Sequence, residues 1–246
     1  MKYTCLKIIL FFFLCKFNYA PADVEDFDNS LTQQYILQEE LEDKIIHRDP
    51  SLEFNRDYIA ISLGSGCVVA GSLRRAGLSE YSFPLNWVIT PLNSLFLLFE
   101  NDFKDYFHKS HLLIKDRGHP GNLGVYDTVY DIHSRHDFLI NKDFWSQYQD
   151  IKSKYERRVA RLYRALSSKK KVYLFRYDID KESSIKLYDL ILKKFPNLDL
   201  TLVCVVKTIN EGISWDLKKI KNYYIDRLHL TNVNSWKKIF EDCDLV

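Results

Sequence analysis

Residues 58–78 constrain the fold of this chain more than any other stretch. An apolar, β-branched run at 59–61 leads into a Gly-Ser-Gly turn at 64–66, and a helix-like segment follows. This order predicts a strand, a tight turn and a helix whose first turn carries Cys67. The positive end of a helix dipole favours the thiolate, which is the reactive form of cysteine. We therefore expect the chemistry of the protein, if it has any, at this turn.

Strand-like and helix-like segments alternate along the rest of the chain. Residues 172–178 and 198–206 predict strands, and 184–195 predict the helix between them. The continuous apolar run at 198–206 is typical of a central strand in a parallel sheet. We expect an α/β fold with a largely parallel central sheet and helices on both faces.

A long helix is predicted from its capping residue, Asp143, to near Ser168. Apolar residues recur along it every three or four positions, so one face is suited to a core. The opposite face is strongly basic, and we expect it to be solvated. Its cations are Lys152, Lys154, Arg157, Arg158, Arg161 and Arg164.

The first residues, 1–22, have the pattern of a secretory signal peptide. Lys2 and Lys7 precede a short apolar run at 8–15, and an Ala-Pro-Ala sequence follows at 20–22. The run is far shorter than the roughly 20 residues of a membrane span. We expect a protein that is secreted, or held in the secretory pathway or periplasm, with no stable membrane insertion after signal removal.

Two further segments complete the predicted organisation. Residues 23–50 form an acidic, helical N-terminal extension, which we interpret as a solvated helix; a pro-segment that covers a site is the alternative. Residues 51–246 form a single α/β domain of a catalytic type, and a hydrophobic content of 46% supplies a sizeable core. The net charge of +2 does not predict a nucleic-acid partner.

The thiol at 67 suggests nucleophilic catalysis, which needs a nearby imidazole and a third group that orients it. His136 is the preferred base, with His133 as the alternative. Asp178 ends its predicted strand and can be the third group. Because the carboxyl ends of parallel strands meet at one sheet edge, we expect Cys67 and Asp178 at that edge.

We expect no metal and no cofactor. The pairs His108/His111 and His133/His136 lack cysteine or carboxylate companions at the usual ligand spacing. Once residues 1–22 are removed, an odd number of cysteines remains, so at least one thiol is free.

Four motifs occur in an order that resembles the DUF1796 family, which is described as papain-like cysteine peptidases. The resemblance covers roughly residues 57–240. The motifs are SLGSGC at 62–67, LRRAGL at 73–78, SFPLNW at 82–87 and HDF at 136–138. The resemblance implies a peptide or another small polar molecule as substrate. It also implies an alternative fold, papain-like α+β, with a helical lobe beside an antiparallel, barrel-like sheet.

The resemblance makes Cys67 the nucleophile and His136 the base. Leu85 and Asn86 stand where the family pattern has Phe and Asp, but Asn86 can still donate hydrogen bonds to an oxyanion. The candidate oxyanion and substrate-binding residues are Ser65, Gly66, Asn86 and Arg176.

Two other functions are compatible with the same residues. The glycine turn at 64–66 can present backbone amides to a phosphate, with Arg74, Arg75 and Arg176 beside it, as in a transferase that uses nucleotide sugars. The full dinucleotide-binding fingerprint is absent. The third possibility is a non-catalytic interaction domain that keeps the fold of an enzyme family.

Overall fold

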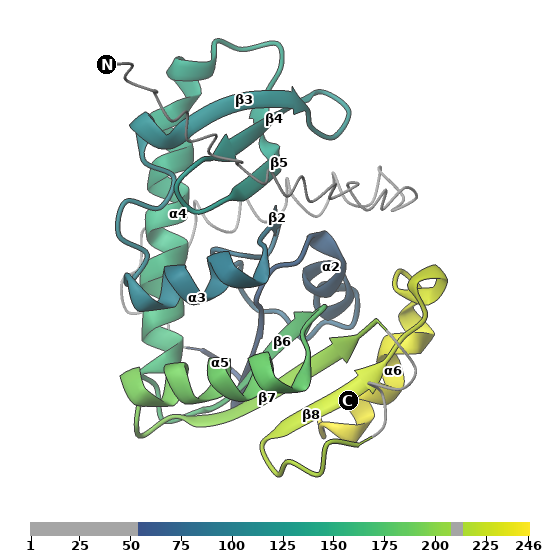
Figure 1. Cartoon of the computed structure of the whole chain (residues 1–246). Helices are drawn as coiled ribbons and strands as arrows, with labels where there is room; N and C mark the ends of the chain where they lie inside the picture. Colours follow the sequence, from purple (N-terminus) through teal and green to yellow (C-terminus); the bar gives the residue numbers. More distant parts are fainter. Residues whose placement is uncertain (1–53, 208–213) are drawn as a thin grey trace, which may run out of the picture.

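A computed structural model describes residues 54–207 and 214–246, and this part of the chain contains two four-stranded sheets (Figure 1). The first sheet is parallel, in the order β1-β6-β7-β8. Its strands are β1 (Tyr58–Ser62), β6 (Lys171–Tyr177), β7 (Asp199–Val206) and β8 (Ile220–Tyr224). The predicted signal peptide and acidic extension lie outside the described residues.

The second sheet is antiparallel, in the order β2-β5-β4-β3. Its strands are β2 (Val88–Ile89), β3 (Leu112–Arg117), β4 (Asn122–Asp127) and β5 (Ile132–Leu139). The prediction of an α/β fold is confirmed, but the prediction of a largely parallel sheet is confirmed only in part. Polar and charged residues are frequent in β3 and β5, so these strands lack the continuous apolar run of a buried parallel strand.

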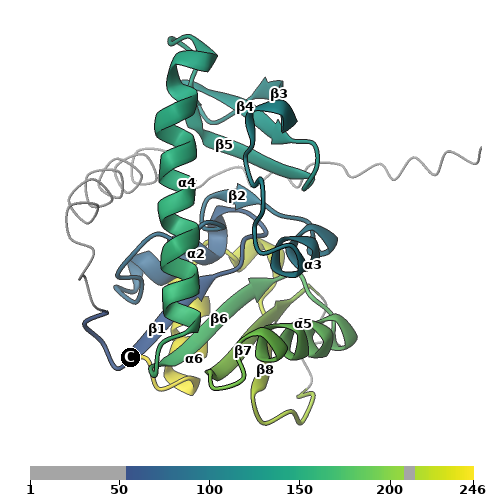
Figure 2. The same ribbon diagram turned by 90° about the vertical axis from the view of Figure 1, so that its left-hand side faces the viewer.

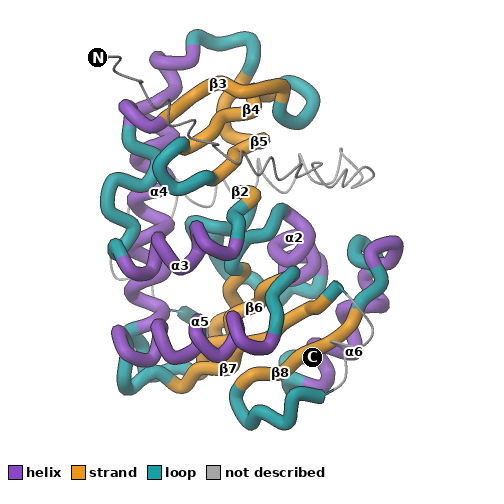
Figure 3. Tube along the Cα trace, viewed as in Figure 1, coloured by secondary structure: helices purple, strands orange, loops and turns teal. Residues whose placement is uncertain are grey.

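Helices cover both faces of the parallel sheet, as predicted (Figure 3). One face packs against α2 (Cys67–Arg75) and α6 (Val233–Asp242), and the other against α3 (Leu92–Glu100), α4 (Phe144–Leu166) and α5 (Lys181–Lys194). Two consecutive residues of β6, which point to opposite faces of the sheet, show this directly. Leu174 packs in the same cluster as Leu187 of α5, whereas Phe175 packs in the same cluster as Phe240 of α6.

Along the chain, the strands of the antiparallel sheet are inserted between β1 and β6, which pair with each other in the parallel sheet. The long helix α4 connects the last inserted strand, β5, back to β6. Figure 2 shows α4 running from the antiparallel sheet to the level of the parallel sheet. Asp143 caps the helix as predicted, because its side chain accepts a hydrogen bond from the Ser146 amide at 2.8 Å. Cys67 begins α2, which follows β1 of the parallel sheet, whereas His136 lies in β5 of the antiparallel sheet, so any contact between them depends on how the two sheets meet.

Three of the six cations on the basic face of α4 are buried, so the prediction of a solvated face is wrong for them, whereas Arg164 is exposed. Lys154, Arg158 and Arg161 are only 7%, 3% and 8% exposed. Lys154 pairs with Asp137 of β5 at 2.7 Å, and Arg161 donates to the main-chain carbonyl of Ser82. Long cationic side chains bury their aliphatic stems wherever their charged ends find partners. Here the antiparallel sheet and the loop after α2 supply those partners.

None of the helices in the described ranges is both long and apolar enough to cross a bilayer.

Candidate active site

The turn before Cys67 has an unusual backbone. Gly64, Ser65 and Gly66 all have positive φ, at 81°, 71° and 97°. A Cβ at Gly64 would lie 2.8 Å from Oγ1 of Thr90, so only glycine fits there without displacement. Gly66 caps α2 without a side-chain hydrogen bond. The first amides of α2, which have no acceptor within the helix, therefore face the turn.

Main-chain hydrogen bonds join this turn to both sheets. The amide of Leu63 donates to Phe175 of β6 at 2.9 Å, and the amide of Gly66 donates to Val88 of β2 at 3.2 Å. The buried guanidinium of Arg176 donates to the carbonyls of Leu63 at 2.9 Å and Thr90 at 2.8 Å. The side chain of Arg176, a predicted substrate-binding residue, is thus buried and links the main chain before the turn to the main chain after β2.

At the junction of the two sheets, Trp87 is part of the surroundings of both Cys67 and His136. Val88 pairs with Ser134 of β5, two residues before His136. Cys67 packs against the cluster that contains Trp87, and the rings of Trp87 and His136 meet edge to face with centroids 6.2 Å apart. One residue of the predicted dyad thus packs against the Ala70–Trp87 cluster, and the other contacts the ring of Trp87.

A second histidine covers His136, and no pattern in the sequence indicated this contact. His119, in the loop between β3 and β4, stacks on His136 with ring centroids 3.8 Å apart. Its amide donates to the Arg135 carbonyl at 2.8 Å, and Nδ2 of Asn122 donates to the His136 carbonyl at 2.6 Å. The glycines close to His119 predict a tight turn between two strands, but they do not predict that His119 covers β5.

The imidazole of His136 is neutral at physiological pH. The residue is only 6% exposed, and burial, followed by repulsion from His119, lowers its pKa to about 3. Its buried Nδ1 has no hydrogen-bond partner among the described residues. A neutral imidazole can accept a proton, but a pKa of about 3 makes it a weak base near pH 7, because a general base acts best when its pKa is close to the working pH.

The thiol of Cys67 does not have the lowered pKa that its position on the helix predicts. Burial raises its pKa and outweighs the backbone amide of Cys67 and the charges of Arg135 and Arg75, which act in the opposite direction. The prediction of an activated thiolate is therefore wrong for this state of the protein. The sequence shows the helix start but does not show how far its packing partners shield the half-buried Cys67.

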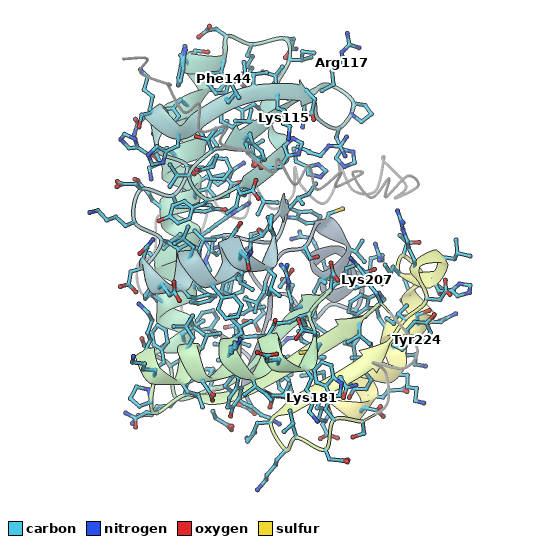
Figure 4. All side chains as sticks on the ribbon, in the orientation of Figure 1. Lys115, Arg117, Phe144, Lys181, Lys207 and Tyr224 are labelled. Carbon is cyan, nitrogen blue, oxygen red and sulfur yellow. The ribbon has the colours of Figure 1, made fainter. Side chains whose placement is uncertain are left out.

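Asp178 lies after the last residue of β6, as predicted, with a positive φ of 64°. Its amide donates to the Val205 carbonyl at 2.9 Å, and its carboxylate pairs with Lys207 at 2.5 Å. Figure 4 shows Lys207 beside the parallel sheet, well below β3. No hydrogen bond or ion pair joins Asp178 to His136 in the described part of the chain, so its role as the third group stays a prediction.

Asn86 and Ser65 lie close in sequence to the residues that border the site. Asn86 is buried next to Trp87, and its Oδ1 has no hydrogen-bond partner among the described residues. Ser65 is half-buried in the turn. Their roles in binding an oxyanion or a substrate stay predictions.

Asp137 has a structural role that its place in the HDF motif did not reveal. It accepts hydrogen bonds from Lys154 at 2.7 Å, Tyr155 at 2.6 Å and Ser134. Burial opposes its ionisation, but the charges of Lys154 and Arg158 hold the pKa of this carboxyl far below its ordinary value. Asp137 thus fixes β5 to α4 while the neighbouring His136 contacts Trp87.

Within residues 54–207 and 214–246, no three His, Cys, Asp or Glu side chains are grouped so that they can hold a metal ion. All three cysteines of these ranges are free thiols. The fold and the site together define a two-sheet α/β protein with a thiol at a helix start and a neutral histidine nearby.

Comparison with known proteins identifies the family. A family model described as "Putative papain-like cysteine peptidase (DUF1796)" matches residues 58–210, and the chain belongs to this family. The resemblance inferred from the motifs is therefore confirmed. The chain is also 26% identical over 210 residues to "Uncharacterized protein R408" of Acanthamoeba polyphaga mimivirus, covering 75% of this chain and 94% of that protein. No solved structure matches the chain.

Proposed function

We propose that this protein is a cysteine hydrolase that cleaves peptide bonds, with Cys67 as the nucleophile and His136 as the general base. One observation carries the proposal: Cys67, at the start of α2, packs against the cluster of Ala70 and Trp87, and His136 of β5 contacts the Trp87 ring. The family description supports the same chemistry. We further propose that the signal peptide predicted at residues 1–22, outside the described residues, directs this activity to the secretory pathway.

The protonation states oppose a preformed ion pair, so the thiol proton has to pass to His136 during the attack. Burial keeps the Cys67 thiol protonated by raising its pKa, and it keeps His136 neutral. His136 would take the thiol proton as Sγ attacks the substrate carbonyl, and would return it to the leaving amine as the thioester forms. Water would then hydrolyse the thioester with His136 again as the base.

The start of α2 is suited to stabilising the charge that develops on the carbonyl oxygen. The amides of its first turn have no acceptor within the helix, and Gly66 provides no side-chain cap. Preorganised backbone donors of this kind form oxyanion holes in enzymes that transfer acyl groups. The amide of Cys67 is the natural first donor, with the side chain of Asn86 as the second candidate.

The test is hydrolysis of a broad panel of fluorogenic peptides by the wild type, Cys67→Ala and His136→Gln. We expect Cys67→Ala to abolish turnover and His136→Gln to lower kcat/KM by roughly 100-fold or more, the usual contribution of a general base. His229→Gln, at an exposed histidine distant in sequence from the site, is the matched control and should keep full activity.

Two outcomes would overturn the proposal. Turnover that survives in purified Cys67→Ala would exclude the thiol as the nucleophile. A folded wild type that neither cleaves any peptide of the panel nor is acylated at Cys67 by peptidyl thioesters would identify a non-catalytic interaction domain.

A further inference from the structure

Arg135 is a cation without a counter-charge in the candidate active site. It lies in β5 between Ser134 and His136, and its Nε is buried without a hydrogen-bond partner in the described part of the chain. No carboxylate of this part forms an ion pair with it. Asp137 of β5 pairs with Lys154, and Asp116 of β3 has its contact, at 3.3 Å, with His133 and not with Arg135.

Its position is fixed by the main chain of the site. The carbonyl of Arg135 accepts the hydrogen bond from His119, and it would lie 2.4 Å from a Cβ at Gly118. The loop between β3 and β4 therefore packs directly against this residue. Ser134, the preceding residue, pairs with Val88, whose carbonyl binds the turn before Cys67.

The charge of Arg135 acts on both members of the proposed dyad. It lowers the pKa of the Cys67 thiol and of the His119 and His136 rings. The guanidinium therefore lies within electrostatic reach of the point where a substrate carbonyl would be attacked. The uncapped start of α2 adds positive potential at the same place.

We propose that Arg135 determines the specificity of this site by binding a carboxylate of the substrate beside the bond that Cys67 attacks. The proposal rests on the function proposed above and adds a substrate class to it, namely acidic peptides. A guanidinium binds a carboxylate through two parallel hydrogen bonds. A partly buried cation without a partner is costly, so a substrate that neutralises it gains selectivity over one that does not.

The first experiment measures anion binding without requiring turnover. It compares alkylation of Cys67 by iodoacetate, which is anionic, with alkylation by neutral iodoacetamide. We expect Arg135→Gln to lower the ratio of the two rates about tenfold, the scale of one lost charge-assisted hydrogen bond. Arg135→Lys should keep most of the ratio, since it preserves the charge. Taking a ratio cancels any change in the pKa of the thiol.

Arg117→Gln is the matched control, because Arg117 is an exposed arginine of β3 that points out from the edge of the sheet (Figure 4). This variant should leave the rate ratio unchanged. A ratio that is the same in the wild type and in folded Arg135→Gln overturns the proposal. An equal fall of the rate ratio in Arg117→Gln would also overturn the proposal. The preference for the anionic reagent would then come from the overall positive charge of the protein and not from Arg135.

The second experiment identifies the source of the carboxylate. Peptide pairs that differ only by Glu or Gln beside the scissile bond test a side chain, and pairs with a free or amidated C-terminus test the terminal carboxylate. We expect one of these pairs to show a preference of about tenfold in kcat/KM that Arg135→Gln removes. If no peptide is cleaved but the ratio of alkylation rates still depends on Arg135, the proposed hydrolase is refuted and the anion site is retained. Turnover without any acidic preference would refute the anion site and retain the hydrolase.

Discussion

Cys67 and His136 are both shifted toward their neutral forms. Burial raises the pKa of the thiol and lowers that of the imidazole to about 3. Both shifts oppose a thiolate–imidazolium pair, even though α2 and Arg135 favour the anion. In this state the site holds a neutral thiol, and the thiolate forms as the proton leaves for His136 during attack.

The pH dependence of alkylation tests this interpretation. The rate of Cys67 with iodoacetamide should keep rising with pH, with a midpoint above the ordinary thiol value of 9.0, because only the thiolate reacts. The measurement is the rate at Cys67 by peptide mass spectrometry, with the buried Cys204 as an internal reference. A plateau that begins below about pH 7 would instead indicate a preformed ion pair.

The sequence indicated the candidate dyad but not its surroundings. The order of the motifs indicated Cys67 and His136, since local patterns mark a helix start and a conspicuous histidine. The stacking of His119 and the unpaired charge of Arg135 depend on a loop that returns across β5. Such a contact between segments leaves no periodic signal in the chain.

At the level of elements, β5 and α4 form the support of the site. The register of β5 with β4 shifts between Ser134 and Phe138, and in this irregular stretch Asp137 binds α4 while His136 contacts Trp87. Lys154 and Tyr155 supply the partners of Asp137 from a helix predicted to be solvated on its basic side. The spacing of apolar residues showed which face of α4 packs against the core. Whether the basic residues of α4 face water or a buried carboxylate depended on β5, which was not predicted as a strand.

Removing the charge of Asp137 should destabilise the protein strongly. Asp137→Asn would leave Lys154 and Arg158 buried without their counter-charge, and breaking a buried pair in this way costs about 3–5 kcal/mol. The measurement is the free energy of unfolding in urea. Asp150→Asn, at an exposed position of α4, is the control and should change it by less than about 0.5 kcal/mol.

A second substitution separates the charge effect from a general packing defect. Lys154→Met in the Asp137→Asn background removes one of the uncompensated cations, and it should recover part of the lost stability. If the two substitutions instead add without coupling, the ion pair does not support β5 in the way proposed here.

For the whole molecule, the site lies where a parallel and an antiparallel sheet meet. The turn before Cys67 hydrogen-bonds to β2 and β6, so the geometry of the site depends on both sheets staying together. The apolar run of β7 predicted the parallel sheet well, because burial on both faces leaves a continuous signal. The antiparallel sheet has an exposed edge strand, β3, and polar inner positions, so its sequence resembles loops.

Conditions that charge the buried histidine should therefore destabilise the entire fold. His136 has a pKa of about 3 when folded and about 6.5 when unfolded, so below pH 6.5 the unfolded chain binds a proton that the folded chain does not. The free energy of unfolding should fall by about 2–3 kcal/mol between about pH 6.5 and pH 4.5 from this residue alone.

Asp137 acts at lower pH, since its depressed pKa gives stability that is present above the ordinary carboxyl pKa and is lost below it. Urea unfolding of the wild type and His136→Gln from about pH 7.5 to pH 4.5 separates the two groups, because this range ends before Asp137 contributes much. His136→Gln should flatten the slope, whereas His229→Gln at an exposed site should keep it. Equal slopes in all three proteins would mean that His136 binds a proton in the folded state near pH 6.5, which its burial beside His119 should prevent.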